Sequence, residues 1–234
     1  MGRSGDEHIR EWAGLHLTEA PGGFVGGWLR ASAAVARPLA RAGVSPNAVT
    51  VAALVAALAA VPLAVIDGWP GPALACVAVT VSGLLDALDG AVAVQAGRAT
   101  KVGFLLDSTL DRLADAAFPV ALALVAEDRG SSAGTLVALA VGAAASCWYL
   151  EYVRARASLA ADPGRQVITP GERPTRIILT AVGLGLPFLA EAALWGHVLI
   201  VGGSALFLLA HSIRRLQRLD RGPRGNEAPP APRG

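Results

Sequence analysis

The chain has 234 residues, of which 53% are hydrophobic and only 16% are charged, whereas about 25% of the residues in an average soluble domain are charged. This composition excludes a disordered chain and argues against an ordinary soluble enzyme. The formal net charge of +2 says little by itself, and we expect no nucleic-acid partner.

Long uncharged stretches decide the class of protein, because a bilayer core about 30 Å thick is crossed by about 20 mostly apolar residues in a helix. The longest stretches without any charged residue are 42–66, 68–85, 130–150 and 192–213, and 177–190 and 116–126 are shorter ones. With a few charges admitted, we predict an all-α, polytopic membrane protein with six transmembrane helices, over about 46–66, 72–95, 103–126, 132–156, 174–193 and 196–214. The alternative is a soluble protein with alanine-rich core helices, which would have to bury all of these runs.

The flanking segments predict how the chain is oriented in the membrane. Residues 1–20 are charged and lack the apolar segment of a secretory signal peptide, so we expect the N-terminus in the cytoplasm. Six spans return the C-terminus to the same side. Lysine and arginine gather in the connections and the tail on that side, which is the positive-inside pattern. We therefore expect a multi-pass protein of the plasma membrane.

Three regions are predicted along the chain. Residues 1–44 form a cytoplasmic or interfacial arm, in which 8–19 and 24–41 are predicted amphipathic helices at the membrane surface. Residues 45–215 form the membrane domain, and residues 216–234 form a basic, disordered cytoplasmic tail. Because cationic segments favour anionic headgroups, membrane lipids are expected partners.

Four aspartates stand at membrane-like positions, where ionisable side chains are costly and usually functional. Asp86 and Asp89 are three residues apart and share one helix face, while Asp107 and Asp111 are four apart and share another. The segment 95–100 between them predicts a turn, and two helices joined by a short turn run antiparallel. We therefore expect the carboxylates to converge near the cytoplasmic ends of these helices.

Such a cluster predicts a metal site. Carboxylates packed together repel one another, and a divalent cation removes that cost. Carboxylate oxygens suit Mg²⁺, Mn²⁺ or Ca²⁺ better than zinc, and Mg²⁺ is typically held by a few carboxylates together with substrate phosphates. The site would therefore bind a phosphate-bearing ligand. A proton or cation transporter is the rival, because intramembrane acids also line ion pathways.

Residues next to the cluster have predicted supporting roles. Asp115, one turn after Asp111, is expected to pair with Arg112 rather than to join the site. Gly90 lets a ligand approach the helix backbone closely, and Gly103 lets the two helices pack tightly.

Residues 86–94 and 103–111 resemble the signature of the CDP-alcohol phosphotransferases, also called CDP-alcohol phosphatidyltransferases. That signature reads D-x2-D-G-x2-A-R, a spacer, then G-x3-D-x3-D, and every fixed position matches except the arginine, which is Val94 here. Residues 45–50, Ser-Pro-Asn-Ala-Val-Thr, resemble the motif at the start of the family's first span. The resemblance covers roughly residues 45–176 and implies a six-helix membrane fold with a cytosol-facing site.

The resemblance also implies an activity, which is transfer of a phosphatidyl group from CDP-diacylglycerol to an alcohol acceptor with release of CMP. It implies that a pair of Mg²⁺ or Mn²⁺ ions is bound by Asp86, Asp89 and Asp107. Asp111 would be the general base for the acceptor hydroxyl and would also contact a metal. The positions at which the family contacts the CDP portion are occupied by Asn47, Thr50, Gly90 and Thr100. Such enzymes are often dimers, so we expect a homodimer.

Val94 is a departure that bears on donor binding. The family's arginine at this position is expected to hold a phosphate of the CDP group. Arg98, one turn later, would reach the same region, and we assign it to the donor site. Val94 also motivates a rival interpretation, in which the chain is a catalytically weak family member that binds CDP-lipid without turnover.

Four arginines at one membrane face predict a phosphate site, and they are Arg154, Arg156, Arg173 and Arg176. Their pattern, R-A-R followed by E-R-P-x-R, resembles the actinobacterial phosphatidylinositol phosphate synthases, whose acceptor is inositol 1-phosphate. Arginines at span ends are also common membrane anchors. Glycerol 3-phosphate, as in a phosphatidylglycerophosphate synthase, and phosphatidylglycerol, as in a cardiolipin-type synthase, stay open as acceptors.

Overall fold

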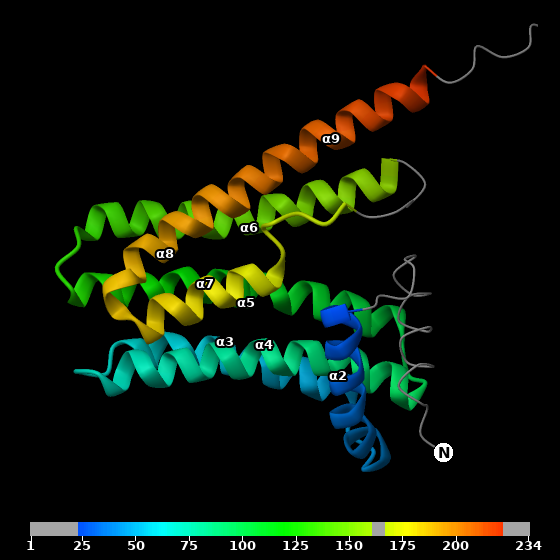
Figure 1. Ribbon diagram of the computed structural model, residues 1–234, viewed down its shortest axis with the longest axis horizontal. Helices are drawn as coiled ribbons and strands as arrows, with labels where there is room; N and C mark the ends of the chain where they lie inside the picture. The colour runs from blue at the N-terminus through cyan, green and yellow to red at the C-terminus, as the bar shows by residue number, and fades with distance from the viewer. Residues whose placement is uncertain (1–22, 161–166, 222–234) are drawn as a thin grey trace, which may run out of the picture.

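The computed structural model describes residues 23–160 and 167–221, and all regular structure within these ranges is helical (Figure 1). The α-helices are α2 (Gly23–Arg41), α3 (Pro46–Ala64), α4 (Pro70–Ala96), α5 (Lys101–Asp128), α6 (Ala133–Ala160), α7 (Arg173–Gly185), α8 (Ala190–Gly196) and α9 (Gly202–Asp220). A 3₁₀ turn, Pro187–Leu189, precedes α8, and a π-helical segment, His197–Val201, joins α8 to α9. The all-α prediction is confirmed for the described residues.

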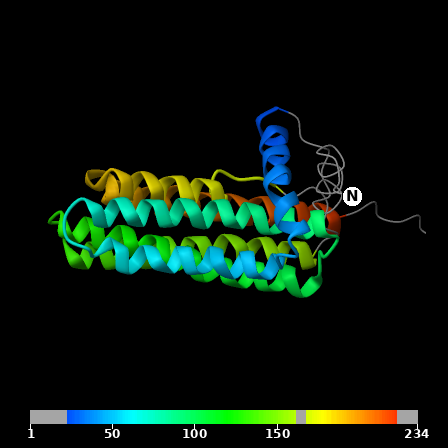
Figure 2. The same cartoon turned by 90° about the horizontal axis from the view of Figure 1, so that it is seen from below.

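Helices α3 to α9 run roughly along the long axis of an elongated bundle, and α2 lies across them near one end (Figure 1). Figure 2 shows the same arrangement from below, with α2 projecting from the side of the bundle. The contact of α2 with α4 is apolar and is formed by Ala36, Leu39, Ala91 and Val92. The end of the bundle that carries α2 also holds the turn between α4 and α5 and the C-terminal end of α9 (Figure 1).

The turn between α4 and α5 forms where the sequence predicts it. Gly97 ends α4 in the left-handed conformation, with a φ of 62°, which a residue with a side chain adopts only at a cost. The Thr100 hydroxyl caps α5 by accepting a hydrogen bond from the backbone N–H of Gly103 at 3.0 Å. Together these features end one helix and start the next within a few residues.

Helix α3 packs against both α4 and α5, while those two helices touch each other little. Phe118 and Leu122, neither of which is exposed, lie in the core that these helices share with α6, α7 and α8. The prediction that Gly103 permits close packing of α4 on α5 is wrong, because a Cβ there would lie 3.2 Å from the Oδ1 atom of Asn47 on α3. The absent side chain makes room for α3 instead.

Large apolar side chains cover the outside of the bundle. Examples that are more than half exposed are Val55, Val77, Val141 and Leu206. Four helical stretches are long and apolar enough to cross a membrane, and they are Pro46–Ala64, Pro70–Ala96, Ala133–Ala160 and Pro187–Asp220. An apolar exterior of this extent is stable against lipid rather than water, so the chain is an integral membrane protein.

The other two predicted spans correspond to α5 and α7. α5 is long enough, with 28 residues, but it carries several charged side chains, and α7 has only 13 residues. The predicted fifth span, 174–193, is wrong at its C-terminal boundary, because α7 ends at Gly185 and the chain turns at Pro187–Leu189. Helical structure then continues to Asp220. The predicted break at 194–195 therefore lies inside a helix.

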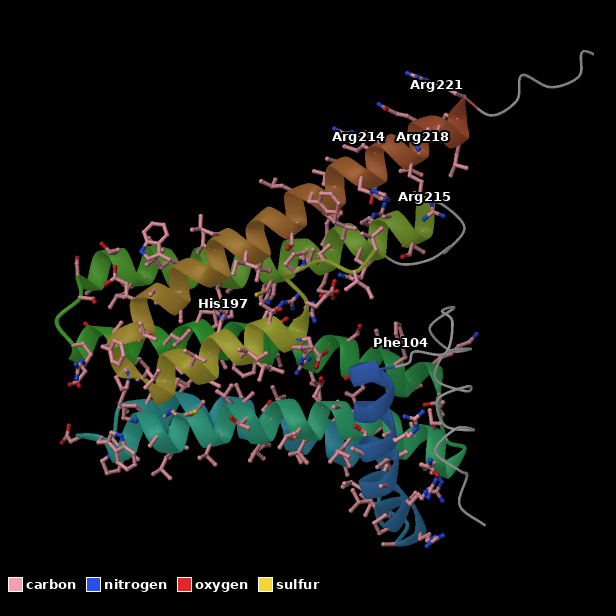
Figure 3. The ribbon with its side chains drawn as sticks, viewed as in Figure 1. Phe104, His197, Arg214, Arg215, Arg218 and Arg221 are labelled. Atoms are coloured by element: carbon pink, nitrogen blue, oxygen red, sulfur yellow. The ribbon has the colours of Figure 1, made fainter. Side chains whose placement is uncertain are left out.

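The two ends of the chain are described only in part. The segment 24–41 of the predicted arm lies in α2, whereas the helix predicted over 8–19 lies outside the described residues. α9 continues through Asp220, so the predicted start of the tail at 216 falls within a helix, and the rest of the tail from 222 lies outside the described residues. Figure 3 shows the basic side chains on the outer end of α9, which are Arg214, Arg215, Arg218 and Arg221.

Candidate functional site

Three of the four predicted aspartates converge where α4 and α5 face each other. Asp86, Asp89 and Asp107 each offer a carboxylate oxygen, and these oxygens all lie within 4.8 Å of one another. The three-residue spacing puts Asp86 and Asp89 on one face of α4, and the turn brings Asp107 of α5 opposite to them. At 1.5 Å per residue, this group lies about 10–15 Å inward of the end of α4 at Ala96.

The surroundings of these carboxylates fit a metal ion. Asp89 is only 6% exposed, and its Oδ2 accepts a hydrogen bond from the Thr50 hydroxyl at 2.6 Å. The Oδ1 atom of Asp107 is buried and has no hydrogen-bond partner in the described part of the chain. Burying carboxylate oxygens without a partner costs free energy. A cation bound between the three carboxylates would offset that cost. An all-oxygen set of this kind suits Mg²⁺ or Mn²⁺, with Thr50 orienting Asp89.

Asp111 lies beside this group but is not one of its three members. Its Oδ1 pairs with Nη1 of Arg173, and its Oδ2 lies 3.9 Å from Nη2 of Arg112. Arg173 also reaches Asp86, with 3.3 Å between Nη2 and Oδ1. Arg173 thus connects the three-carboxylate group to Asp111, and metal binding by Asp111 stays a prediction.

The residues predicted for the donor divide into two sets. Asn47 and Thr50 project from α3, and both are at least partly buried. Thr50 bonds to Asp89, whereas Asn47 lies against Gly103 of α5. Gly90 is exposed, and a Cβ placed on it would meet no atom within 4 Å, so the helix surface next to Asp89 is open. Arg98 and Thr100 are exposed in the turn between the helices. The Thr100 hydroxyl is already engaged as the cap of α5.

Val94 cannot face the open side of the site, because it is only 3% exposed. An arginine at position 94 would have to extend from this buried position for its guanidinium group to reach the open side of the site. Arg98 lies one turn further along, beyond the end of α4, and its side chain is exposed. Its predicted contact with the donor stays a prediction.

The four predicted acceptor arginines have different surroundings. Arg154 Nη2 lies 2.6 Å from Glu172, and its Nε lies 3.5 Å from Glu151. Arg156 is exposed on the same helix. Arg173 lies between two aspartates, as described above. Arg176 has no exposed surface and is enclosed by carboxylates. The structure therefore leaves some of these guanidinium groups accessible and encloses one.

Sequence reasoning missed Glu151, which lies near three arginines of this region. The signal was present, since Glu151 is an ionisable residue inside the predicted span 132–156, and the reasoning that singled out the aspartates applies to it as well. The predicted pair of Asp115 with Arg112 is confirmed, at 3.3 Å between Oδ2 and Nη2.

A model of the CDP-alcohol phosphatidyltransferase family matches residues 43–209 of this chain. The phosphatidylinositol phosphate synthase of Cutibacterium acnes is 34% identical over 206 residues, which cover 84% of this chain and 94% of that protein. The phosphatidylinositol phosphate synthase of Mycolicibacterium smegmatis is 32% identical over 200 residues, with coverage of 80% and 85%. The archaetidylinositol phosphate synthase of Aeropyrum pernix is 33% identical over 151 residues, with coverage of 64% and 72%.

Solved structures show the same fold. The crystal structure of Mycobacterium tuberculosis phosphatidylinositol phosphate synthase with CDP-DAG bound matches with a TM-score of 0.60 and 25% identity, covering 80% of this chain and 94% of that chain. A second crystal structure of that protein, in complex with manganese and citrate, matches with a TM-score of 0.59 and 24% identity, covering 80% and 88%.

Proposed function

This chain belongs to the CDP-alcohol phosphatidyltransferase family, and from that premise we propose that it transfers the phosphatidyl group of CDP-diacylglycerol to inositol 1-phosphate and releases CMP. It is accordingly a transferase of phospholipid synthesis. The observation that carries the proposal is the three-carboxylate group, which Arg173 connects to Asp111, with Arg112 on the other oxygen of Asp111. A diphosphate donor needs the metal cation that such carboxylates would hold, and a phosphorylated acceptor needs guanidinium groups.

Asp86, Asp89 and Asp107 would hold the metal, which we propose to be two Mg²⁺ or Mn²⁺ ions. When bound, the ions supply charge neutralisation at the diphosphate and orient it for in-line attack. The manganese complex of the M. tuberculosis relative supports an ion of this class. Asp111 would also approach the metal, since it lies one helical turn from Asp107 on α5.

Asp111 is the proposed general base. The acceptor hydroxyl attacks the lipid-bearing phosphorus, its proton passes to the Asp111 carboxylate, and the bond from that phosphorus to the oxygen of CMP breaks. The position of Asp111 next to Arg173 supports this role, because that guanidinium would hold an anionic acceptor close to the base.

The donor site is proposed to include the exposed backbone at Gly90, the side chains of Asn47 and Thr50, and the turn residues Arg98 and Thr100. The open surface at Gly90 supports a close approach of the CDP portion to α4. Arg98 would supply the cationic contact that Val94 lacks. The CDP-DAG bound to the M. tuberculosis relative supports this donor.

Arg154, Arg156 and Arg173 are the proposed contacts for the acceptor phosphate. Inositol 1-phosphate is favoured over glycerol 3-phosphate and phosphatidylglycerol because the relatives named above include phosphatidylinositol phosphate synthases and an archaetidylinositol phosphate synthase. Direct contact of Arg176 with the acceptor is not favoured, since its side chain is fully enclosed.

We further propose that α5 and α7 cross the membrane with the four apolar stretches, so that six spans place both termini in the cytoplasm. Residues 1–44 would form an interfacial arm, with α2 lying in the plane of the membrane surface, and the basic tail from 216 would lie on the same side. The orientation of α2 across the bundle end supports this arrangement (Figure 1). The plasma membrane is the proposed location, and a homodimer is the proposed assembly because alanine- and glycine-rich spans permit close helix packing.

The test is CMP release from CDP-diacylglycerol by the full chain in detergent or lipid, with Mg²⁺ or Mn²⁺ and one acceptor per reaction: inositol 1-phosphate, inositol, glycerol 3-phosphate or phosphatidylglycerol. We expect metal-dependent release with inositol 1-phosphate. Release with only one of the other acceptors would identify that compound as the acceptor in place of inositol 1-phosphate and would leave the proposed class of reaction unchanged. Binding of CDP-diacylglycerol without release by any acceptor would support the catalytically weak binder instead.

A further inference from the structure

Arg176 stands at the centre of a buried network of ion pairs behind the proposed acceptor site. Its Nη1 lies 2.8 Å from Oδ2 of Asp115 and its Nη2 lies 2.8 Å from Oε1 of Glu151. Its Nε donates to the backbone carbonyl of Gly171 at 2.9 Å. The side chain of Arg176 is 0% exposed. Each of its three nitrogens therefore has a partner, and none faces the open side of the site.

The same two acids hold the arginines on either side. Arg112, whose backbone follows Asp111 directly, lies 3.3 Å from Asp115 and 3.7 Å from Glu151. Arg154, a proposed acceptor contact, lies 3.5 Å from the other oxygen of Glu151. The network thus connects the neighbour of the proposed base on α5 to the proposed acceptor contact on α6.

The charge balance of this network explains why Arg176 matters. Arg176 takes the shortest contacts of Asp115 and Glu151, so Arg112 and Arg154 approach these two acids only to 3.3–3.7 Å. Arg154 is also held by Glu172 at 2.6 Å, and the side chains of Arg112 and Arg154 keep 25% and 18% of their surface exposed to another anion. Without Arg176, Asp115 and Glu151 would be left with Arg112 and Arg154 as their cationic partners. Because a buried carboxylate is costly without a cation, Arg112 and Arg154 would then be drawn inward, away from the acceptor.

We propose that Arg176 is a positioning residue that, through Asp115 and Glu151, holds Arg112 and Arg154 at the distances that acceptor binding requires. The inference rests on the proposed function. It assigns to Arg176 an indirect role, in place of the direct phosphate contact predicted from the sequence, and it assigns to Glu151 the connection between the arginines.

The variants Arg176→Lys and Glu151→Gln test this role, with steady-state CMP release measured separately against inositol 1-phosphate and CDP-diacylglycerol. Arg176→Lys keeps the charge but replaces three separate nitrogens in a planar fork by one ammonium nitrogen, which cannot reach Gly171, Asp115 and Glu151 together. Glu151→Gln keeps the shape at a side chain that is 27% exposed, so it stays informative if Arg176→Lys fails to fold. Arg218→Gln, at the exposed outer end of α9 (Figure 3), is the matched arginine control.

We expect the KM for inositol 1-phosphate to rise about tenfold or more in each variant, since misplacement of binding groups by about an ångström has effects of this size. The KM for CDP-diacylglycerol should stay within about twofold, and Arg218→Gln should match the wild type. In the double variant, the fold-increase in the acceptor KM should be well below the product of the fold-increases in the two single variants, because both residues belong to one network.

Four results would overturn the proposal. An acceptor KM near the wild-type value in Glu151→Gln, with a raised one in Arg176→Lys, would restore direct contact between Arg176 and the acceptor. An equal rise of both KM values, with a lowered midpoint of thermal unfolding, would indicate a role in folding alone. Absence of CMP release from the wild type with every acceptor would remove the proposed function and this inference together, whereas an active wild type with unaffected variants would remove only the inference.

Discussion

Asp111 lies between two arginines of different origin, Arg173 from α7 and Arg112 from its own helix. The carboxylates of Asp86, Asp89 and Asp107 lie close to one another, and Arg173 connects this group to Asp111. At the scale of single residues, the site is therefore divided into an acidic half that suits cations and a basic half that suits phosphates. Asp111 stands at the boundary, where a hydroxyl carried by a phosphorylated acceptor would meet the donor.

Replacing Asp111 by Asn should separate catalysis from donor binding. Loss of a positioned general base lowers turnover by roughly 10²–10⁴-fold, whereas the metal group of Asp86, Asp89 and Asp107 remains. We therefore expect CMP release to fall by at least about a hundredfold while metal-dependent binding of CDP-diacylglycerol persists. Turnover above a tenth of the wild-type rate would assign the proton to another group.

Arg98→Ala should weaken donor binding. A hydrogen bond to a charged group contributes about 1.5–3 kcal/mol, so the dissociation constant for CDP-diacylglycerol in the presence of metal should rise by roughly tenfold or more. The KM for inositol 1-phosphate should not change. Arg129→Ala, in the turn at the far end of α5, is the control, and equal donor affinities in the two variants would remove Arg98 from the donor site.

At the scale of elements, the approach of α5 to α4 is governed by the turn and by α3. Gly97 and the Thr100 cap set where one helix ends and the next begins, and both helices pack mainly on α3 rather than on each other. Thr50 of α3 bonds to Asp89 of α4, and Asn47 of α3 lies against Gly103 of α5. The first span therefore positions both halves of the metal group.

Two glycine-to-alanine substitutions should have opposite effects. At Gly97 the φ of 62° makes a side chain unfavourable by about 1–2 kcal/mol, so the midpoint of thermal unfolding of Gly97→Ala should fall by a few degrees.

At Gly90 a Cβ meets nothing within 4 Å, so the stability of Gly90→Ala should hold or rise, while its KM for CDP-diacylglycerol should increase if the donor approaches this backbone. A donor KM unchanged in Gly90→Ala would place the CDP portion elsewhere.

At the scale of the whole molecule, one end of the bundle carries the polar chemistry. α2, the turn between α4 and α5 and the basic end of α9 all lie there (Figure 1). The stretch Pro187–Asp220 has 34 residues, or about 50 Å at 1.5 Å per residue, which exceeds a hydrocarbon core of about 30 Å. The arginines on its outer end (Figure 3) would therefore lie among headgroups or beyond them, where cations belong.

Cysteine labelling checks the six-span topology. In a background with Cys76→Ala and Cys147→Ala, an introduced Ser132→Cys lies in the turn between α5 and α6, and Gln217→Cys lies near the end of α9; both positions are exposed. We expect a membrane-impermeant thiol reagent to label the first in intact cells and the second only in inside-out vesicles. Labelling of both from the same side would contradict the proposed crossings.

Much of the site follows from local spacing. The three-residue separation of Asp86 and Asp89 and the turn at Gly97 are properties of short segments, so their convergence with Asp107 was predictable and is confirmed. The break between the last two predicted spans was misplaced because hydropathy alone does not show where an apolar run bends. The local signal for the bend is Pro187, which stands at the observed turn.

The amino-acid sequence by itself determined that this is a helical membrane protein with an aspartate-based metal group, because hydrophobic length and helical periodicity act within single segments. Only the tertiary structure decided what the arginines do. Arg176 meets Asp115, 61 residues earlier, and Glu151, 25 residues earlier, so its enclosure depends on three helices at once. Charge neutralisation acts through space, and no spacing along one helix reveals which of several cations a buried carboxylate will select.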